Sequence, residues 1–148
     1  MKKILPVFLF LFVFQFIAVS QNFDKITQII STDEITNAQA AYIAAIYAGD
    51  VTDRSTELDA FNSLKEKGFF KTSDSPDAKI KLSSLCSLFA KVTNVKGGFM
   101  FALTKKSARY SYREFIAKGY ISRNADPMMT VSGTQAIGLF NSVTGGTK

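Results

Sequence analysis

The chain has 148 residues, a net charge of +6, a single cysteine and no histidine. The absence of histidine excludes the serine triad, the cysteine–histidine dyad and most zinc sites, and one cysteine cannot form an intramolecular disulfide. The length suits one domain around one hydrophobic core.

Residues 1–20 have the pattern of a signal peptide. Two lysines precede an apolar run, and small residues at its end suit cleavage between Ser20 and Gln21. Because the run is short for a membrane span, we expect export to the periplasm, the cell surface or the extracellular space, with an uncleaved N-terminal anchor as the alternative. The single domain would then occupy residues 21–148 and contain no transmembrane span.

Charge is distributed unevenly along this domain. Residues 21–77 contain five basic and ten acidic side chains, a net −5, whereas residues 78–148 contain eleven basic and two acidic ones, a net +9. The asymmetry predicts an acidic partner for the C-terminal half or self-association between the halves, with ordinary solvated charge as the alternative. Nucleic acid is not an expected partner of an exported protein.

The first predicted elements are helical. Residues 22–30 have apolar residues at helical spacing, and an alanine-rich helix is expected over 36–48. Thr36 and Gln39 form a capping box at the start of this second helix. Gly49 provides a natural end.

The middle of the chain predicts two further helices and a turn between them. Asp53 is expected to cap a helix over 54–67, and a polar loop containing Pro76 leads to a longer helix over 82–93. Cys86 lies within the apolar pattern of this longer helix, so we expect a buried side chain without reactivity.

The last third begins with a break at Gly97-Gly98, followed by a packed connector at residues 99–101. Ser107 or Ser111 is expected to cap the next helix, with Ser111 and Glu114 as a capping box. After a polar loop, a final helix is expected over 132–143.

The sequence repeats itself. Phe61–Val92 aligns with Tyr112–Val143 at a constant offset of 51 and without a gap, and Glu34–Gly49 shares the helix start of both segments. We therefore expect a mostly α-helical protein, a compact helical bundle of two full helix-loop-helix repeats and one partial repeat. The three units are expected at about residues 22–49, 53–93 and 107–143.

The repeated unit resembles the S-layer homology (SLH) repeat: a helix, a glycine, two apolar residues, a polar loop with proline, then a hydroxyl-capped helix. The segments Lys96–Met100, Arg109–Glu114 and Asp126–Gly133 are also similar to small exported spirochaete proteins without an established activity. The SLH resemblance implies a three-fold-like helical bundle that attaches to the cell envelope without catalysis.

One departure from the SLH pattern concerns the arginine that follows the helix cap and helps to bind acidic cell-wall glycan. Asn37, Leu82 and Gly133 occupy its place in the three units. The resemblance therefore does not extend glycan binding to these positions.

A basic and aromatic segment provides the candidate ligand-binding residues. Guanidinium groups suit carboxylate or phosphate, and a tyrosine can stack on a sugar, so an acidic envelope glycan, a lipid phosphate or an acidic protein surface would fit. Alternatively, the arginines bond to carbonyl groups or to nearby carboxylates. The candidates are Lys105, Lys106, Arg109, Tyr110, Arg113 and Arg123.

No pattern indicates catalysis, a metal or a cofactor. Glu114 and Asp126 are the acids of the basic half, but the first is placed to pair with Lys118 and the second to start a turn. Acidic residues at 50–59 lack the spacing of a calcium loop, and Gly97-Gly98 lacks the pattern of a phosphate loop. We expect a non-catalytic envelope-binding or adaptor module, with a self-assembling structural envelope protein as the alternative and a small hydrolase as a third.

Overall fold

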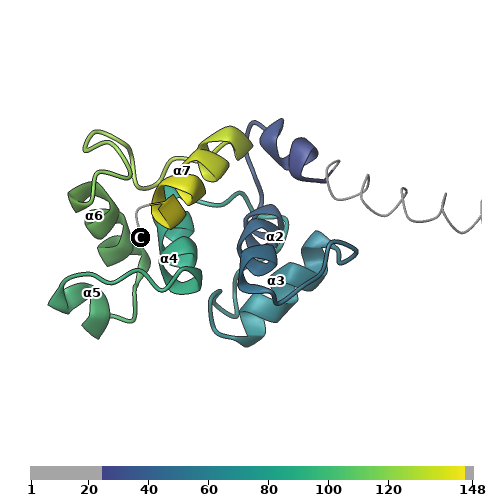
Figure 1. Cartoon of the computed structure of the whole chain (residues 1–148), viewed down its shortest axis with the longest axis horizontal. Coiled ribbons are helices and arrows are strands. Elements are labelled where there is room, and N and C mark those ends of the chain that lie inside the picture. Colours follow the sequence, from purple (N-terminus) through teal and green to yellow (C-terminus); the bar gives the residue numbers. More distant parts are fainter. Residues whose placement is uncertain (1–24, 146–148) are drawn as a thin grey trace, which may run out of the picture.

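The structure is a computed structural model that describes residues 25–145, and in this part of the chain it is mostly helical, with isolated β-bridges and no strand (Figure 1). The cleavage site expected at Ser20 and Gln21 lies outside the described residues. None of the helices in the described part is long and apolar enough to cross a membrane. Residues 25–30 are helical, and the following helices are α2 (Asn37–Ala48), α3 (Glu57–Glu66), α4 (Leu82–Val92), α5 (Phe99–Leu103), α6 (Ala108–Ala117) and α7 (Gly133–Gly145).

Two of the three long helices begin with a capping box. The Thr36 hydroxyl accepts from the Gln39 N–H at 3.2 Å, and the Gln39 side chain accepts from the Thr36 N–H at 3.0 Å. Ser132 and Gln135 form the same pair of bonds at 3.2 and 3.0 Å. Both boxes satisfy backbone donors that a helix start leaves free, which confirms the predicted positions of α2 and α7.

The third long helix, α4, begins without a side-chain cap at Lys81. Its first two backbone N–H groups donate to the loop of the following unit: Leu82 to the Met129 carbonyl and Ser83 to the Pro127 carbonyl, both at 3.0 Å. Backbone groups from a distant segment therefore satisfy the first two donors of α4, although no side chain caps it.

The same type of bond joins the three helix starts into a ring. Asn37 donates to the Ala78 carbonyl, as Leu82 does to Met129, and Gly133 donates to the Thr32 carbonyl. The residues just before the three caps lie at the centre and are at most 2% exposed; these are Ile35, Ile80 and Val131. Each unit thus completes the helix start of another, and the first and last units close the ring.

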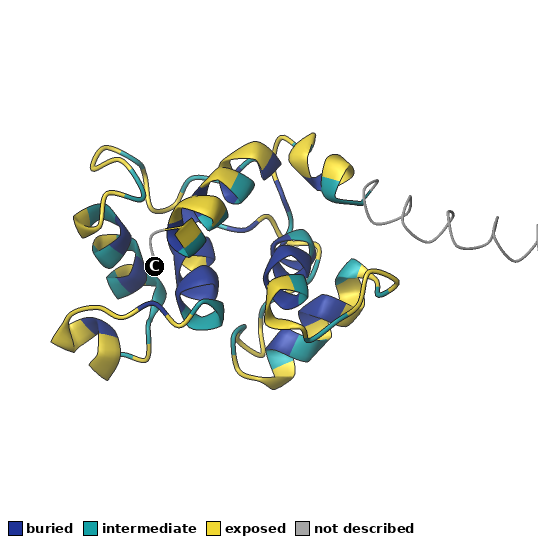
Figure 2. Ribbon diagram, in the orientation of Figure 1, coloured by how far each residue is buried: buried dark blue, intermediate teal, exposed yellow. Residues whose placement is uncertain are grey.

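The core lies between the long helices (Figure 2). Phe140 on α7 makes edge contacts with Phe89 on α4 and Tyr47 on α2, with ring centroids 5.0 and 5.2 Å apart. Cys86 is fully buried as predicted, and burial raises the pKa of its thiol to about 12. This thiol is therefore protonated at neutral pH.

The start of α3 differs from the prediction. Thr56, not Asp53, is the N-cap, and the Asp59 carboxylate accepts from the Thr56 N–H at 2.8 Å. Asp53 lies instead in the turn before the helix, where Thr52 N–H donates to the Ser55 hydroxyl. A threonine with an acid three residues later satisfies two donors, so this start competes better than a lone aspartate.

The predicted capping box of Ser111 and Glu114 is wrong. Ser107 is the N-cap of α6, without a side-chain bond, and Ser111 is buried inside the helix. Its hydroxyl donates to the Lys106 carbonyl at 2.9 Å. The turn before α6 brings the Lys106 carbonyl to Ser111, so the hydroxyl bonds to this carbonyl and does not cap the helix.

The connector expected at residues 99–101 is the short helix α5. Phe101 is buried at 3% exposure, but Phe99 is 78% exposed. The segment is therefore packed through one side only. Its other side faces solvent.

Candidate binding groove

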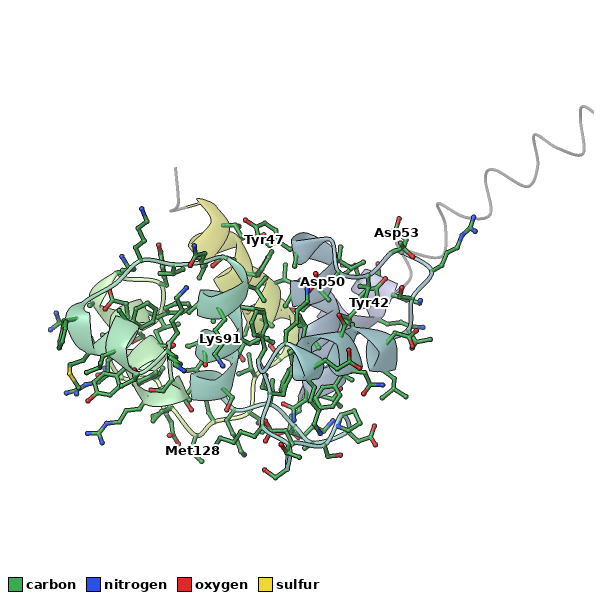
Figure 3. All side chains as sticks on the ribbon, turned by 90° about the horizontal axis from the view of Figure 1, so that it is seen from below. Tyr42, Tyr47, Asp50, Asp53, Lys91 and Met128 are labelled. Atoms are coloured by element: carbon green, nitrogen blue, oxygen red, sulfur yellow. The ribbon has the colours of Figure 1, made fainter. Side chains whose placement is uncertain are left out.

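A groove of about 660 Å³ lies between the loop at residues 68–79, α4 and the start of α6. We call it the basic groove, because its lining includes six cationic side chains and one carboxylate, Asp74. Lys91 is on α4 near the middle of the molecule, between the α2–α3 side and the α6 side (Figure 3). The six cations are Lys71, Lys79, Lys81, Lys91, Lys105 and Arg109.

Lys91 is half-buried in the wall of the basic groove. Its Nζ lies 3.4 Å from the Phe69 carbonyl oxygen and 5.9 Å from the centre of the Phe69 ring. Desolvation lowers the pKa of Lys91, although the nearby Asp74 carboxylate acts in the opposite direction. The groove therefore holds this ammonium group in a partly desolvated position, where a bound anion would favour its charged form.

Lys105 and Lys106 shape the rim of the basic groove through their backbone. Both have left-handed φ angles, of 52° and 56°, which are uncommon for lysine. Two serine hydroxyls hold the Lys106 carbonyl: Ser87 on α4 at 2.6 Å and Ser111 on α6 at 2.9 Å. This serine clamp turns the chain at the rim of the groove, joining α4 to α6.

The cations of the basic groove have few acidic neighbours. Within residues 25–145, none of the six has a nitrogen within 4.0 Å of a carboxylate oxygen. The ion pairs of this part of the chain are Lys67–Asp50 and Lys118–Glu114. Lys79 donates to the Glu34 carbonyl at 2.8 Å, which is a backbone contact. The groove consequently carries a concentrated positive field.

The structure divides the candidate residues predicted from the sequence. Lys105 and Arg109 line the basic groove. Tyr110 and Arg113 line a separate hollow of about 370 Å³ beside α5. The Lys106 ammonium donates to the Asn94 side chain at 2.8 Å.

Arg123, the sixth candidate, is exposed in the loop after α6 and lines neither hollow. Sequence reasoning missed the lysines that the middle unit contributes. A residue-by-residue comparison at the offset of 51 would have identified them. Each aligns with a hydroxyl residue in the other repeat, so the fold does not require a lysine there. The four missed lysines are Lys71, Lys79, Lys81 and Lys91.

A second groove, of about 250 Å³, occupies the equivalent position in the third unit. Tyr120 and Ile121 stand where the basic groove has Phe69 and Phe70, and six further lining positions correspond at the same offset although their residue types differ. We call it the neutral groove, because its lining contains no charged side chain. The four lysine positions hold Ser122, Thr130, Ser132 and Ser142.

Two acidic residues of the segment at 50–59 have structural contacts. Asp50 pairs with Lys67, and Asp59 belongs to the capping box of α3. Hydrogen bonds from Thr56 lower the pKa of Asp59. No group of three or more histidine, cysteine, aspartate or glutamate residues within the described range could hold a metal ion.

The two acids considered for catalysis also have local partners. Glu114 lies 3.7 Å from the Lys118 ammonium, which confirms the predicted helix-surface pair. Asp126 accepts from the Met128 N–H at 2.8 Å, as expected at the start of a turn. Neither geometry resembles a pair of carboxylates facing a common substrate.

No protein-family model matches this sequence, and no curated protein matches it either. Any functional conclusion therefore depends on the groove and its surroundings.

Proposed function

We propose that this protein is an exported, non-catalytic binding or adaptor module of the cell envelope that holds an anionic polymer in the basic groove. The observation that carries the proposal is the lining of six cations, none within 4.0 Å of a carboxylate in the described range. Like charges held together repel, and a polyanion would relieve that repulsion. The neighbouring unit repeats the groove without its lysines, so the fold does not require them.

An acidic envelope glycan is the ligand that we favour among the anionic candidates. Phe69 and Phe70 lie in the lining beside Lys71 and Lys91, so apolar faces and cations are presented together. A sugar ring can pack on an aromatic side chain while its carboxylate meets an ammonium group. A lipid phosphate or an acidic protein surface shares the charge but not the need for such an apolar platform.

We also propose that the three units are SLH-like. Support comes from the ring of backbone bonds that joins the three helix starts, and from the buried residues at its centre. The positions of the SLH arginine hold Asn37, Leu82 and Gly133, so the cations of this chain come from other positions. The proposed ligand contacts therefore differ from those of the SLH repeat.

The test uses the processed protein, expressed from the full chain, and polygalacturonate as the anionic probe, with neutral dextran for comparison. We expect binding to polygalacturonate that weakens as salt rises. The variant Lys71→Ser/Lys81→Ser/Lys91→Ser installs the serines of the neutral groove. It should bind roughly tenfold more weakly or worse, with a smaller salt dependence.

The matched control removes three cations elsewhere: Lys96→Ser/Lys118→Ser/Arg123→Ser. These residues do not line the basic groove, so binding should change little although the net charge falls by the same amount. Equal losses in both triple variants would show that net charge alone attracts the polymer. Absence of binding by the wild-type protein would contradict the proposal directly.

Self-assembly into an envelope structure is the second candidate, favoured by the net charges of −5 and +9 on residues 21–77 and 78–148. It predicts oligomers that form without added ligand and dissociate as salt rises. Light scattering on the same protein, recorded before the polymer is added, separates this outcome from groove binding.

A further inference from the structure

Helix α5 displays large apolar side chains at one end of the molecule. Phe99 is 78% exposed, Leu103 62% and Met100 43%. Phe99 and Leu103 are four residues apart and share a helix face, whereas Phe101 faces the core. Figure 1 shows α5 beside α6 at the edge of the molecule, on the side away from α3, and Figure 2 shows it largely exposed.

Specific contacts hold α5 in this position. The Thr104 hydroxyl donates to the Met100 carbonyl at 2.7 Å, and the Gly98 N–H donates to the Glu114 carboxylate at 3.3 Å. A Cβ at Gly97 would lie 2.5 Å from the Phe101 ring, so the chain before α5 is closely packed. The apolar face is therefore presented on an ordered element, which reduces the entropy cost of binding.

The segment of the chain around the apolar face is rich in cations. Residues 95–113 include five basic side chains and no acidic one. Arg113 lines the hollow beside α5 together with Phe99, Met100 and Glu114. The nearest acid in the sequence, Glu114, is paired with Lys118 and bonded to Gly98.

We propose that α5 is a membrane-contacting surface for anionic lipid bilayers. Phe99 and Leu103 would enter the boundary between head groups and acyl chains, while Lys96 and Arg113 meet lipid phosphates. Apolar anchors combined with cations are the two signals that reversible attachment to an anionic membrane requires. Because Phe99, Leu103, Lys96 and Arg113 do not line the basic groove, this surface is separate from the proposed glycan site.

A second copy of the chain is the other conceivable occupant of this face. A two-fold contact would place the same surface against itself, so the cations around α5 would face their own copies. Such juxtaposition of like charges is unfavourable, whereas an anionic bilayer neutralises them. The charge pattern thus favours lipid.

The test is flotation of the processed protein, expressed from the full chain, with phosphatidylcholine vesicles that contain or lack phosphatidylglycerol. The wild-type protein should float with the anionic vesicles only. Phe99→Ser/Leu103→Ser should reduce the partition coefficient by at least about tenfold. Both side chains are exposed, so circular dichroism and the melting temperature should remain unchanged.

The matched control is Leu58→Ser/Met128→Ser, which removes two large apolar side chains that are 51% and 61% exposed in other parts of the surface. This variant should float like the wild type. The chain has no tryptophan, so Phe99→Trp introduces a single tryptophan whose emission should shift to the blue on anionic vesicles.

Three results would overturn the membrane proposal. They are equal flotation of both double variants, unshifted emission from Phe99→Trp, and a concentration-dependent dimer that Phe99→Ser/Leu103→Ser abolishes. Polygalacturonate binding measured on the same variant separates the two sites. If binding to the polymer persists while vesicle binding is absent in the wild type, the membrane surface fails and the groove proposal stands.

Discussion

The basic and neutral grooves occupy equivalent places in successive units but differ in chemistry. Phe69 and Phe70 of the basic groove correspond to Tyr120 and Ile121 of the neutral groove, which preserves the apolar floor. The four lysines become hydroxyl residues at the same offset. Packing therefore restricts the floor of each groove, whereas the rim can change its charge without changing the fold.

The residue after each helix cap sets the character of each contact between units. Asn37 lines the basic groove and donates to the Ser75 carbonyl at 2.8 Å, and Leu82 lines the neutral groove. At the third contact, a Cβ on Gly133 would lie 1.6 Å from the Ile29 carbonyl oxygen. The backbones approach so closely there that a side chain would not fit.

The largest effect is expected where the ring closes. Gly133→Ala must separate α7 from residues 29–30, which should lower the free energy of unfolding by about 3 kcal/mol or more. Urea denaturation followed by circular dichroism measures this loss.

The control for ring closure is Gly138→Ala, on the same helix beside the neutral groove. No atom lies within 4 Å of its added Cβ, so helix propensity should raise stability by roughly 0.5–1 kcal/mol. Similar behaviour of the two alanine variants would contradict the close backbone approach at Gly133.

An intermediate effect is expected at the serine clamp, which has no counterpart in the neutral groove, because Gly138 stands in the place of Ser87. Ser87→Ala or Ser111→Ala alone should cost about 1 kcal/mol of unfolding free energy, since the other hydroxyl still bonds the Lys106 carbonyl. The double variant should cost more than the sum of the single changes.

Thermal or urea unfolding of the two single variants and the double variant provides this comparison. Ser142→Ala is the control, because its exposed hydroxyl bonds only within α7, and its effect should stay within about 0.5 kcal/mol. Strict additivity at Ser87 and Ser111 would show that the two hydroxyls do not share one acceptor.

The smallest effect on stability is expected at Lys91, whose pKa is lowered by desolvation. Between this lowered pKa and the ordinary value, the unfolded chain binds more protons than the folded one, so wild-type stability should rise with pH there. Lys91→Met should flatten that rise and increase stability at neutral pH by less than about 1 kcal/mol.

The same variant should bind polygalacturonate about threefold more weakly, because one cation of the basic groove is lost. Lys118→Met is the control: it removes a cation outside the groove and should leave binding unchanged. A loss of stability in Lys91→Met at neutral pH would contradict the expectation that the partly desolvated ammonium group of Lys91 destabilises the folded state.

The local sequence was sufficient to predict the long helices. Capping boxes at Thr36 and Ser132 and the glycine after α2 act within a few residues, so their effect is visible in the chain alone. Cys86 was correctly expected in the core, because the apolar period of α4 surrounds it. Asp53 was misassigned because Thr56, with Asp59, forms a stronger cap nearby. Ser111 was misassigned because the turn before α6 offers its hydroxyl the Lys106 carbonyl.

The basic groove depended on tertiary structure. Its cations come from the loop after α3, from α4, from the turn before α6 and from α6 itself, so they are spread along the chain from residue 71 to residue 109. The sequence placed Lys105 and Arg109 in a basic segment, but Arg113 lies at another hollow although it is only one turn away. Charge and repeat are properties of the chain itself, whereas the grouping of cations follows from the ring of backbone bonds that brings the three units together.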